Sequence, residues 1–277
     1  MEFPLQAVGD RQLHYYESEK DSDVQLVFLP SGFNPELWRH QINYFSRELK
    51  TVCFRPVEGE RGFRGELEAL ETVLSQDHLR NVVLVSHTVG NPVARRMEGD
   101  DNVIATVVSG LLNDLDDIPS KTVYRGIWGA LRRKGKLMKK LFFADGTDYR
   151  VVKEFAEDLE PPVHEDLESF IDRYSWRESL KHSMIIYPQG DRFSSREFLE
   201  SMQKGSSVSV LKGAGTFPFY EKPQEFNKAL HDFLSKVMDY VDRKKLVEKR
   251  SRNRSLREFE ERPSSDKSLE KKLKMKR

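Results

Sequence analysis

Cysteine is almost absent from this sequence: Cys53 is the only one in 277 residues. No intrachain disulfide can form, which favours a reducing compartment. The sequence also has no uninterrupted apolar run of about 18 residues, the length that a membrane-spanning helix needs, and its first residues lack the basic and then apolar pattern of a secretory leader. We therefore expect a cytoplasmic protein without a transmembrane segment.

Motifs for cofactors and metals are missing as well. The sequence contains no phosphate-binding P-loop, no dinucleotide fingerprint and no cluster of Cys and His with metal-ligand spacing. The three glycines of GERGFRG, residues 59–65, follow an expected strand but lack the Gly-x-Gly-x-x-Gly spacing. We expect no cofactor and no metal.

Charge is distributed unevenly along the chain. Residues 243–277 hold fifteen Lys and Arg against six Asp and Glu, a net charge of +9. The whole chain carries +1, so residues 1–242 carry −8. The sequence thus combines an acidic body with a strongly basic tail.

Short apolar segments alternate with amphipathic helical segments along the body. Apolar runs that predict buried strands cover residues 24–30, 51–57, 82–86, 103–111, 183–187 and 206–215. Helical spacing covers residues 36–49, 65–76 and 223–238, and residues 6–18 alternate as a leading antiparallel hairpin does. This order predicts an α/β fold with a mostly parallel sheet of about eight strands.

One long stretch interrupts the alternation. About 70 residues between the strands at 103–111 and 183–187 show helical patterns broken by prolines and glycine but no strand pattern. The stretch is too long for a simple crossover, so we predict a helical cap inserted at 113–181. The core then comprises 1–112 and 182–240, and 241–277 form a basic tail that we expect to be disordered, apart from a part that continues the helix at 223–238.

The sequence VVLVSHTVGNPVARRM, residues 82–97, carries the strongest functional signal. A buried strand turns sharply into a helix, with the small residues Ser86 and Gly90 placed two before and two after Thr88. This is the pattern of a nucleophile elbow, in which a serine normally stands at the centre. Here Thr88 stands there.

Several further segments follow in the order of one family. LPSGF (29–33), YPQGDRF (187–193) and GAGTFPFYEKPQEF (213–226) each end a predicted strand. With the elbow, they make residues 3–238 resemble the α/β-hydrolase fold superfamily, as a divergent member. The resemblance implies the α/β-hydrolase fold, a mostly parallel sheet with an inserted helical cap.

The resemblance also assigns catalytic positions. It places Thr88 at the nucleophile, Asp191 at the acid and Thr216 where the family carries its catalytic histidine. Two of these three triad positions therefore differ from the family pattern.

The oxyanion hole is assigned in the same way. It would use the backbone N–H groups of Phe33 and Val89, in a loop that keeps Gly32 but has Ser31 where histidine is common. These residues would line the pocket beside the elbow.

The two substitutions at the triad positions remove the proton relay. A hydroxyl becomes a strong nucleophile only when a base takes its proton, and Thr216 cannot do so near neutral pH. Loss of the histidine alone costs about 10⁶ in turnover in a serine protease. We therefore predict a protein without the usual Ser–His pair that binds a small apolar or carbonyl-bearing ligand, or a partner, without catalysis.

Two alternatives remain open. In the first, the protein is a weak carboxylic-ester hydrolase that uses Thr88, with proton transfer from His164 in the cap or from the substrate. In the second, it is an interaction protein that acts through its basic tail on an acidic partner. The tail has almost no aromatic residue to stack on bases, which argues against nucleic acid. The basic segment 124–143 is best explained as a cap helix over the pocket.

Overall fold

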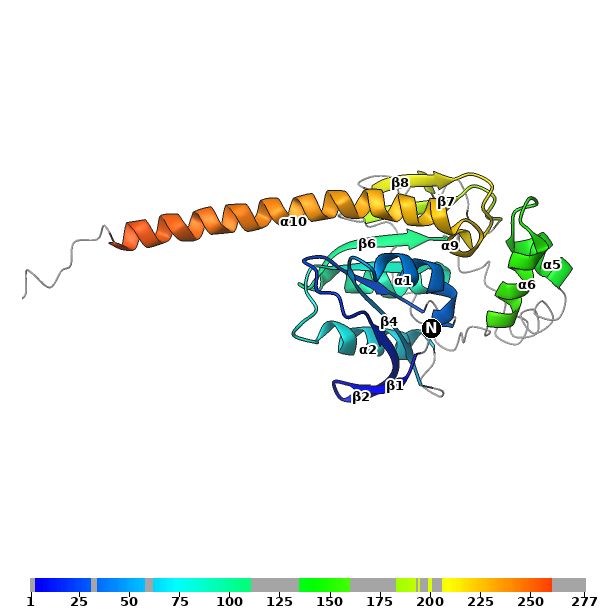
Figure 1. Ribbon diagram of the computed structural model, residues 1–277, viewed down its shortest axis with the longest axis horizontal. Coiled ribbons are helices and arrows are strands. Elements are labelled where there is room, and N and C mark those ends of the chain that lie inside the picture. Colours follow the sequence, from blue (N-terminus) through cyan, green and yellow to red (C-terminus); the bar gives the residue numbers. More distant parts are fainter. Residues whose placement is uncertain are drawn as a thin grey trace, which may run out of the picture. The chain divides into compact units, whose positions relative to one another are not determined.

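A computed structural model describes residues 3–30, 34–57, 62–110, 135–159, 183–192, 194, 199–200 and 206–260. Within this part of the chain, eight strands form one sheet in the order β1-β2-β4-β3-β5-β6-β7-β8 (Figure 1). The strands are β1 (Leu5–Val8), β2 (Arg11–Glu17), β3 (Gln25–Phe28), β4 (Lys50–Pro56), β5 (Val82–His87), β6 (Val103–Ser109), β7 (Ser183–Pro188) and β8 (Ser206–Leu211).

The direction of the strands confirms the predicted sheet. β2 pairs antiparallel with β1 and with β4, and every pair from β4 through β8 is parallel. β3 and β5 are buried along their whole length, as expected for continuous apolar runs at the centre of a sheet that is covered on both faces. This is the mostly parallel sheet that the resemblance to the α/β-hydrolase fold implies.

Helices connect and cover the strands. The described helical segments are η1 (Pro35–Trp38), α1 (Arg39–Phe45), α2 (Phe63–Leu74), η2 (Thr88–Gly90), α3 (Asn91–Arg96), η3 (Met97–Gly99), α5 (Gly135–Phe142), α6 (Tyr149–Asp158), α9 (Pro218–Glu221) and α10 (Pro223–Glu260). The apolar face expected for 65–76 is real: Ala69, Leu70 and Val73 of α2 are fully buried in a cluster with β3, β4 and β5.

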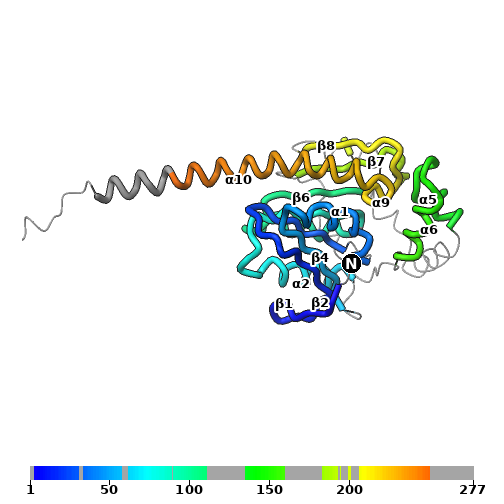
Figure 2. The backbone as a smooth tube through the Cα atoms, viewed as in Figure 1, coloured from blue at the N-terminus to red at the C-terminus, as the bar shows by residue number. Residues whose placement is uncertain are grey.

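The insertion and the tail are described only in part. Residues 135–159 hold the helices α5 and α6, which lie side by side (Figure 2). The role of 113–181 as a cap remains a prediction, and the other residues of that range lie outside the described ones. The closing helix expected at 223–238 continues to Glu260, so the tail begins as helix.

The chain divides into two compact units, Met1–Val237 and Met238–Arg277. Helix α10 runs from the first unit into the second. None of the helices in the described ranges is both long enough and apolar enough to cross a membrane.

Candidate functional site

Thr88 lies at the turn from β5 into η2, as the elbow pattern predicts. Its backbone has a φ of +41°, in the left-handed region that β-branched residues rarely adopt. Holding Thr88 there costs roughly 1–3 kcal/mol, which the surrounding structure must offset. Its Oγ1 atom is buried, and no described group forms a hydrogen bond with it.

A network of buried hydrogen bonds holds the turn between β5 and η2 in place. Ser86 Oγ donates to Oδ1 of Asn91 over 2.8 Å, and Asn91 Nδ2 donates to the carbonyl oxygen of Ser109 over 3.0 Å. A Cβ atom on Gly110 would lie 2.3 Å from Cε1 of His87 and 3.0 Å from Cγ2 of Thr88. The elbow can therefore pack against the end of β6 only because position 110 is glycine.

His87 precedes Thr88 and is completely buried. Its Nδ1 lies 3.2 Å from Ser109 Oγ, and its ring packs against Phe217 and Phe219 at 5.3 and 4.9 Å between centroids. Burial lowers the pKa of His87 to about 3, so the ring is neutral across physiological pH. The ring of His87 is therefore part of the core beside the elbow.

Asp191 and Thr216, in the loops that follow β7 and β8, form a direct hydrogen bond. Thr216 Oγ1 donates to Asp191 Oδ1 over 2.9 Å, and both residues are buried. Ser194 Oγ donates to Asp191 Oδ2 over 2.6 Å. One carboxylate thus accepts from two hydroxyl groups, one of which stands at the family's histidine position.

Segment 142–144, at the end of α5, covers the backbone at Thr216. The N–H of Thr216 donates to the carbonyl oxygen of Phe142 over 2.7 Å. Glu221 accepts from the N–H of Gly215 and the N–H of Ala144, each over 2.9 Å, and from Thr147 Oγ1 over 2.7 Å. Burial raises the pKa of Glu221, and these hydrogen bonds oppose that shift. Glu221 therefore ties the insertion to the loop that holds Thr216.

Two of the three triad positions are in direct contact, and the third lies in a neighbouring segment. Asp191 and Thr216 are joined directly, and the residues beside Thr88 and Thr216, His87 and Phe217, are in ring contact. The elbow and the Thr216 loop are thus neighbours at the carboxyl edge of the parallel strands, where sites of such sheets lie. Thr88 forms no hydrogen bond to either of the other two in the described structure.

Other predicted groups lie outside the described residues. These are Gly32 and Phe33 of the oxyanion loop and His164 of the insertion. Val89 lies in η2, directly after Thr88, but its role as an oxyanion donor remains a prediction. Nowhere in the described ranges do three His, Cys, Asp or Glu side chains gather as a metal site would require.

Two residues of the site were not predicted from the sequence. Ser194 stands three residues after Asp191, a spacing at which a hydroxyl can reach back to a carboxylate at a turn. No pattern in the sequence around Glu221 predicts its role, because its partners Ala144 and Thr147 lie more than 70 residues away along the chain.

Comparison with known proteins gives a consistent result. A family model described as "Alpha/beta hydrolase family" matches residues 26–229. None of the curated proteins matches the sequence.

Solved structures of similar fold include three enzymes. A thermophilic esterase from Thermogutta terrifontis is 16% identical, with 86% of this chain and 98% of that chain covered and a TM-score of 0.64. The enol-lactonase from Burkholderia xenovorans LB400 is 15% identical, with coverage of 84% and 100% and a TM-score of 0.60. The bromoperoxidase from Bacillus anthracis is 17% identical, with coverage of 81% and 95% and a TM-score of 0.60. At these identities, the likeness shows the fold alone.

Proposed function

The chain belongs to the alpha/beta hydrolase family, and we propose that its cleft binds a small apolar or carbonyl-bearing ligand without hydrolysing it. The observation that carries this proposal is the buried hydrogen bond of 2.9 Å from Thr216 to Asp191. In the family this acid orients an imidazole. Here it holds a hydroxyl.

The proposal rests on the chemical consequence of having a threonine where the family has its catalytic histidine. Catalysis by a triad needs a group that takes a proton from the nucleophile and returns it to the leaving group. A threonine hydroxyl does neither near pH 7, and the hydroxyl of Thr216 already donates a hydrogen bond to Asp191. The loss of about 10⁶ in turnover expected from removing the imidazole corresponds to roughly 8 kcal/mol of barrier.

The surroundings of Thr216 are apolar. Phe142 and Phe155 of the insertion both contact Phe217, with ring centroids 6.0 and 4.3 Å apart. Aromatic side chains from the insertion and from the core thus meet directly beside Thr216. Pockets for small molecules are lined mainly by such side chains, with a few polar groups that fix orientation.

Two measurements test the proposal. Turnover of short p-nitrophenyl esters by the wild-type protein should not exceed the buffer rate, and a phosphonate probe for serine hydrolases should not label it. Stoichiometric labelling of Thr88 would refute a non-catalytic role. The double variant Thr88→Ser/Thr216→His tests whether the site lacks only the serine and histidine of the triad. A gain of ester turnover would show that the rest of the site can still support hydrolysis.

Ligand binding needs its own measurement. Saturation-transfer NMR with p-nitrophenyl butyrate should show contact with the protein, weakened several-fold by Phe142→Ala. Lys136→Ala, an exposed position on the same helix α5, is the matched control and should leave binding unchanged. Equal signals from both variants would place the ligand elsewhere.

A second candidate function is weak ester hydrolysis by Thr88. It is favoured by the left-handed backbone of Thr88 and by its buried hydroxyl, which has no hydrogen-bond partner among the described residues. Proton transfer would come from His164 or from the substrate itself. This function predicts slow ester turnover that Thr88→Ala abolishes and His164→Ala reduces, whereas identical rates in wild type and Thr88→Ala would dispose of it.

A further inference from the structure

The last part of α10 is a helical segment rich in basic residues. Residues 242–249 are exposed without interruption, including the apolar Leu246 at 57% and Val247 at 65%. From Arg243 to the end of the helix at Glu260, eight Lys and Arg stand against three Glu, a net charge of +5. This segment, residues 243–260, is called the basic helix below.

The helical register gathers the positive positions. At 3.6 residues per turn, seven of the eight basic positions fall within an arc of about 200°. They form two rows, one of positions 243, 250, 254 and 257, and the other of positions 245, 249 and 252. Two parallel rows of positive charge on one helix match a ligand that carries two rows of negative charge.

The same register argues against a membrane surface as the ligand. A helix that lies in a lipid interface needs a continuous apolar face that enters the acyl region. The register places the positions of its four apolar residues in three directions around the axis, because only Leu256 and Phe259, three residues apart, share one side, and Leu246 and Val247 each stand elsewhere. The segment therefore has no apolar face to insert.

The continuous helix also changes the argument about nucleic acids. Scarcity of aromatic residues counts against single strands, whose bases stack on aromatic rings. Duplex recognition does not need stacking: an α-helix about 10–12 Å wide fits a major groove about 12 Å wide and contacts the phosphates on both sides. We propose that the basic helix binds double-stranded DNA through its phosphate backbone, without sequence preference.

The dimensions and the charge of the rest of the chain fit this assignment. The 18 residues of the basic helix span about 27 Å, or roughly eight base pairs. Residues 1–242 carry a net charge of −8 and repel a polyanion, so the contact is confined to the tail. The affinity comes from release of counterions and is steeply dependent on salt.

The test uses the full chain and a fluorescent 20-base-pair duplex in anisotropy titrations from 50 to 200 mM salt. The variant Arg250→Gln/Arg252→Gln/Arg254→Gln/Arg257→Gln removes four charges and keeps residues that favour helix. The control Lys136→Gln/Lys153→Gln/Lys212→Gln/Lys228→Gln removes four charges from exposed positions of the body. An Arg→Lys variant at the four tail positions keeps the charge.

The proposal expects binding that weakens with salt in the wild type, the body control and the Arg→Lys variant alike. In the Arg→Gln variant, the slope of log affinity against log salt should become shallower by about three to four, since each phosphate contact contributes roughly 0.9. An unchanged slope would overturn the proposal. Tighter binding to the single-stranded 20-mer, or binding to phosphatidylserine vesicles in place of the duplex, would also overturn it.

Discussion

Gly215 and Phe142 approach each other so closely that no side chain fits between them. A Cβ atom on Gly215 would lie 2.5 Å from the carbonyl oxygen of Phe142 and 2.8 Å from the backbone nitrogen of Ala144. Both neighbours are backbone atoms, and Phe142 O accepts the hydrogen bond from the N–H of Thr216. The contact between the insertion and the histidine position thus depends on the absence of a side chain at 215.

Gly215→Ala should break this contact. The added methyl group must push segment 142–144 away, at a cost of about 1–3 kcal/mol in the free energy of unfolding. Chemical denaturation measures the loss. Gly146→Ala is the control, because a Cβ atom at Gly146 meets nothing within 4 Å. If both variants are equally stable, the insertion does not pack on the Thr216 loop as described.

The hydrogen bond from Thr216 to Asp191 can be tested by removing only its donor. Thr216→Val keeps the shape of the side chain, and the buried carboxylate loses one of its partners. We expect a loss of about 1–3 kcal/mol in the free energy of unfolding. Thr216→Ser keeps the hydroxyl and should lose less than half as much. A valine variant as stable as the wild type would show that this bond contributes nothing to folding.

The sequence was sufficient for the fold because the fold depends on local patterns. The apolar runs at β3 and β5 are buried along both faces, and such runs can be recognised without knowing their neighbours. The elbow was predictable for the same reason, since the strand, the turn and the helix follow one another within 82–97. The left-handed φ of Thr88 is what that pattern requires.

Contacts between distant segments were not predictable in this way. The residue types at positions 191 and 216 already indicate that Asp191 accepts a hydrogen bond from a hydroxyl and not from an imidazole. They do not indicate that segment 142–144 covers the backbone at Thr216. The carboxylate of Glu221 joins residues from two parts of the chain that no period or motif relates. That part of the tail continues the closing helix was expected, but composition alone did not predict how far, because a highly charged segment with few apolar residues is typical of disorder.

Backbone strain at Thr88 gives a third prediction. Thr88→Gly places a residue in the left-handed region that adopts it without steric cost. Relief of roughly 1–3 kcal/mol of strain exceeds the entropy cost of about 0.4–1 kcal/mol that glycine adds in the unfolded chain. We therefore expect Thr88→Gly to raise the midpoint of thermal unfolding. Thr88→Val, which keeps the branched side chain and the strain, should raise the midpoint less than Thr88→Gly does. A lower midpoint for Thr88→Gly than for the wild type would contradict a strained elbow.

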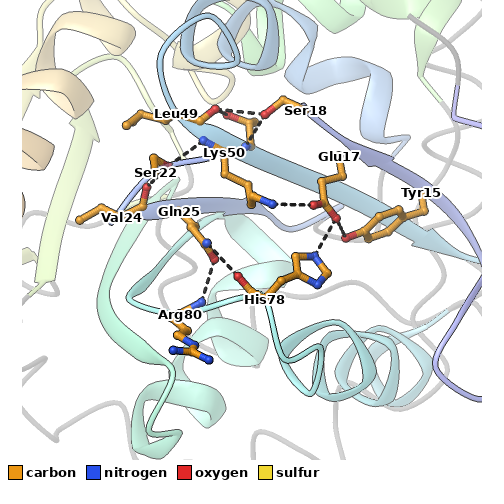
Figure 3. Close-up of polar contacts among 11 residues, drawn as sticks. Tyr15, Glu17, Ser18, Ser22, Val24, Gln25, Leu49, Lys50, His78 and Arg80 are labelled. Carbon is orange, nitrogen blue, oxygen red and sulfur yellow. Dashed lines mark hydrogen bonds and ion pairs between the residues drawn. The ribbon is translucent and has the colours of Figure 1, made fainter. Parts of the chain in front are cut away.

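The last prediction concerns Glu17, a carboxylate of β2 with three partners (Figure 3). Glu17 Oε2 accepts from the hydroxyl of Tyr15 over 2.7 Å and lies 3.1 Å from His78 Nε2, and Oε1 accepts from Lys50 Nζ over 3.0 Å. Burial alone would raise the pKa of Glu17, but the hydrogen bonds from Tyr15, Lys50 and His78 outweigh it and lower the pKa below its usual 4.5.

A lowered native pKa makes Glu17 a source of stability that depends on pH. Its contribution is fully present above the unfolded pKa near 4.5 and is lost as the pH falls through the lower native value, because the unfolded chain binds the proton first. Glu17→Gln should therefore lower the free energy of unfolding at pH 7 and make it less dependent on pH below about 4.5. Denaturant titrations from pH 7 to pH 3 measure both effects. Glu71→Gln, at an exposed position of α2, is the control. Equal free energies of unfolding for the Glu17 variant and the wild type across this pH range would show that the cluster does not stabilise the fold.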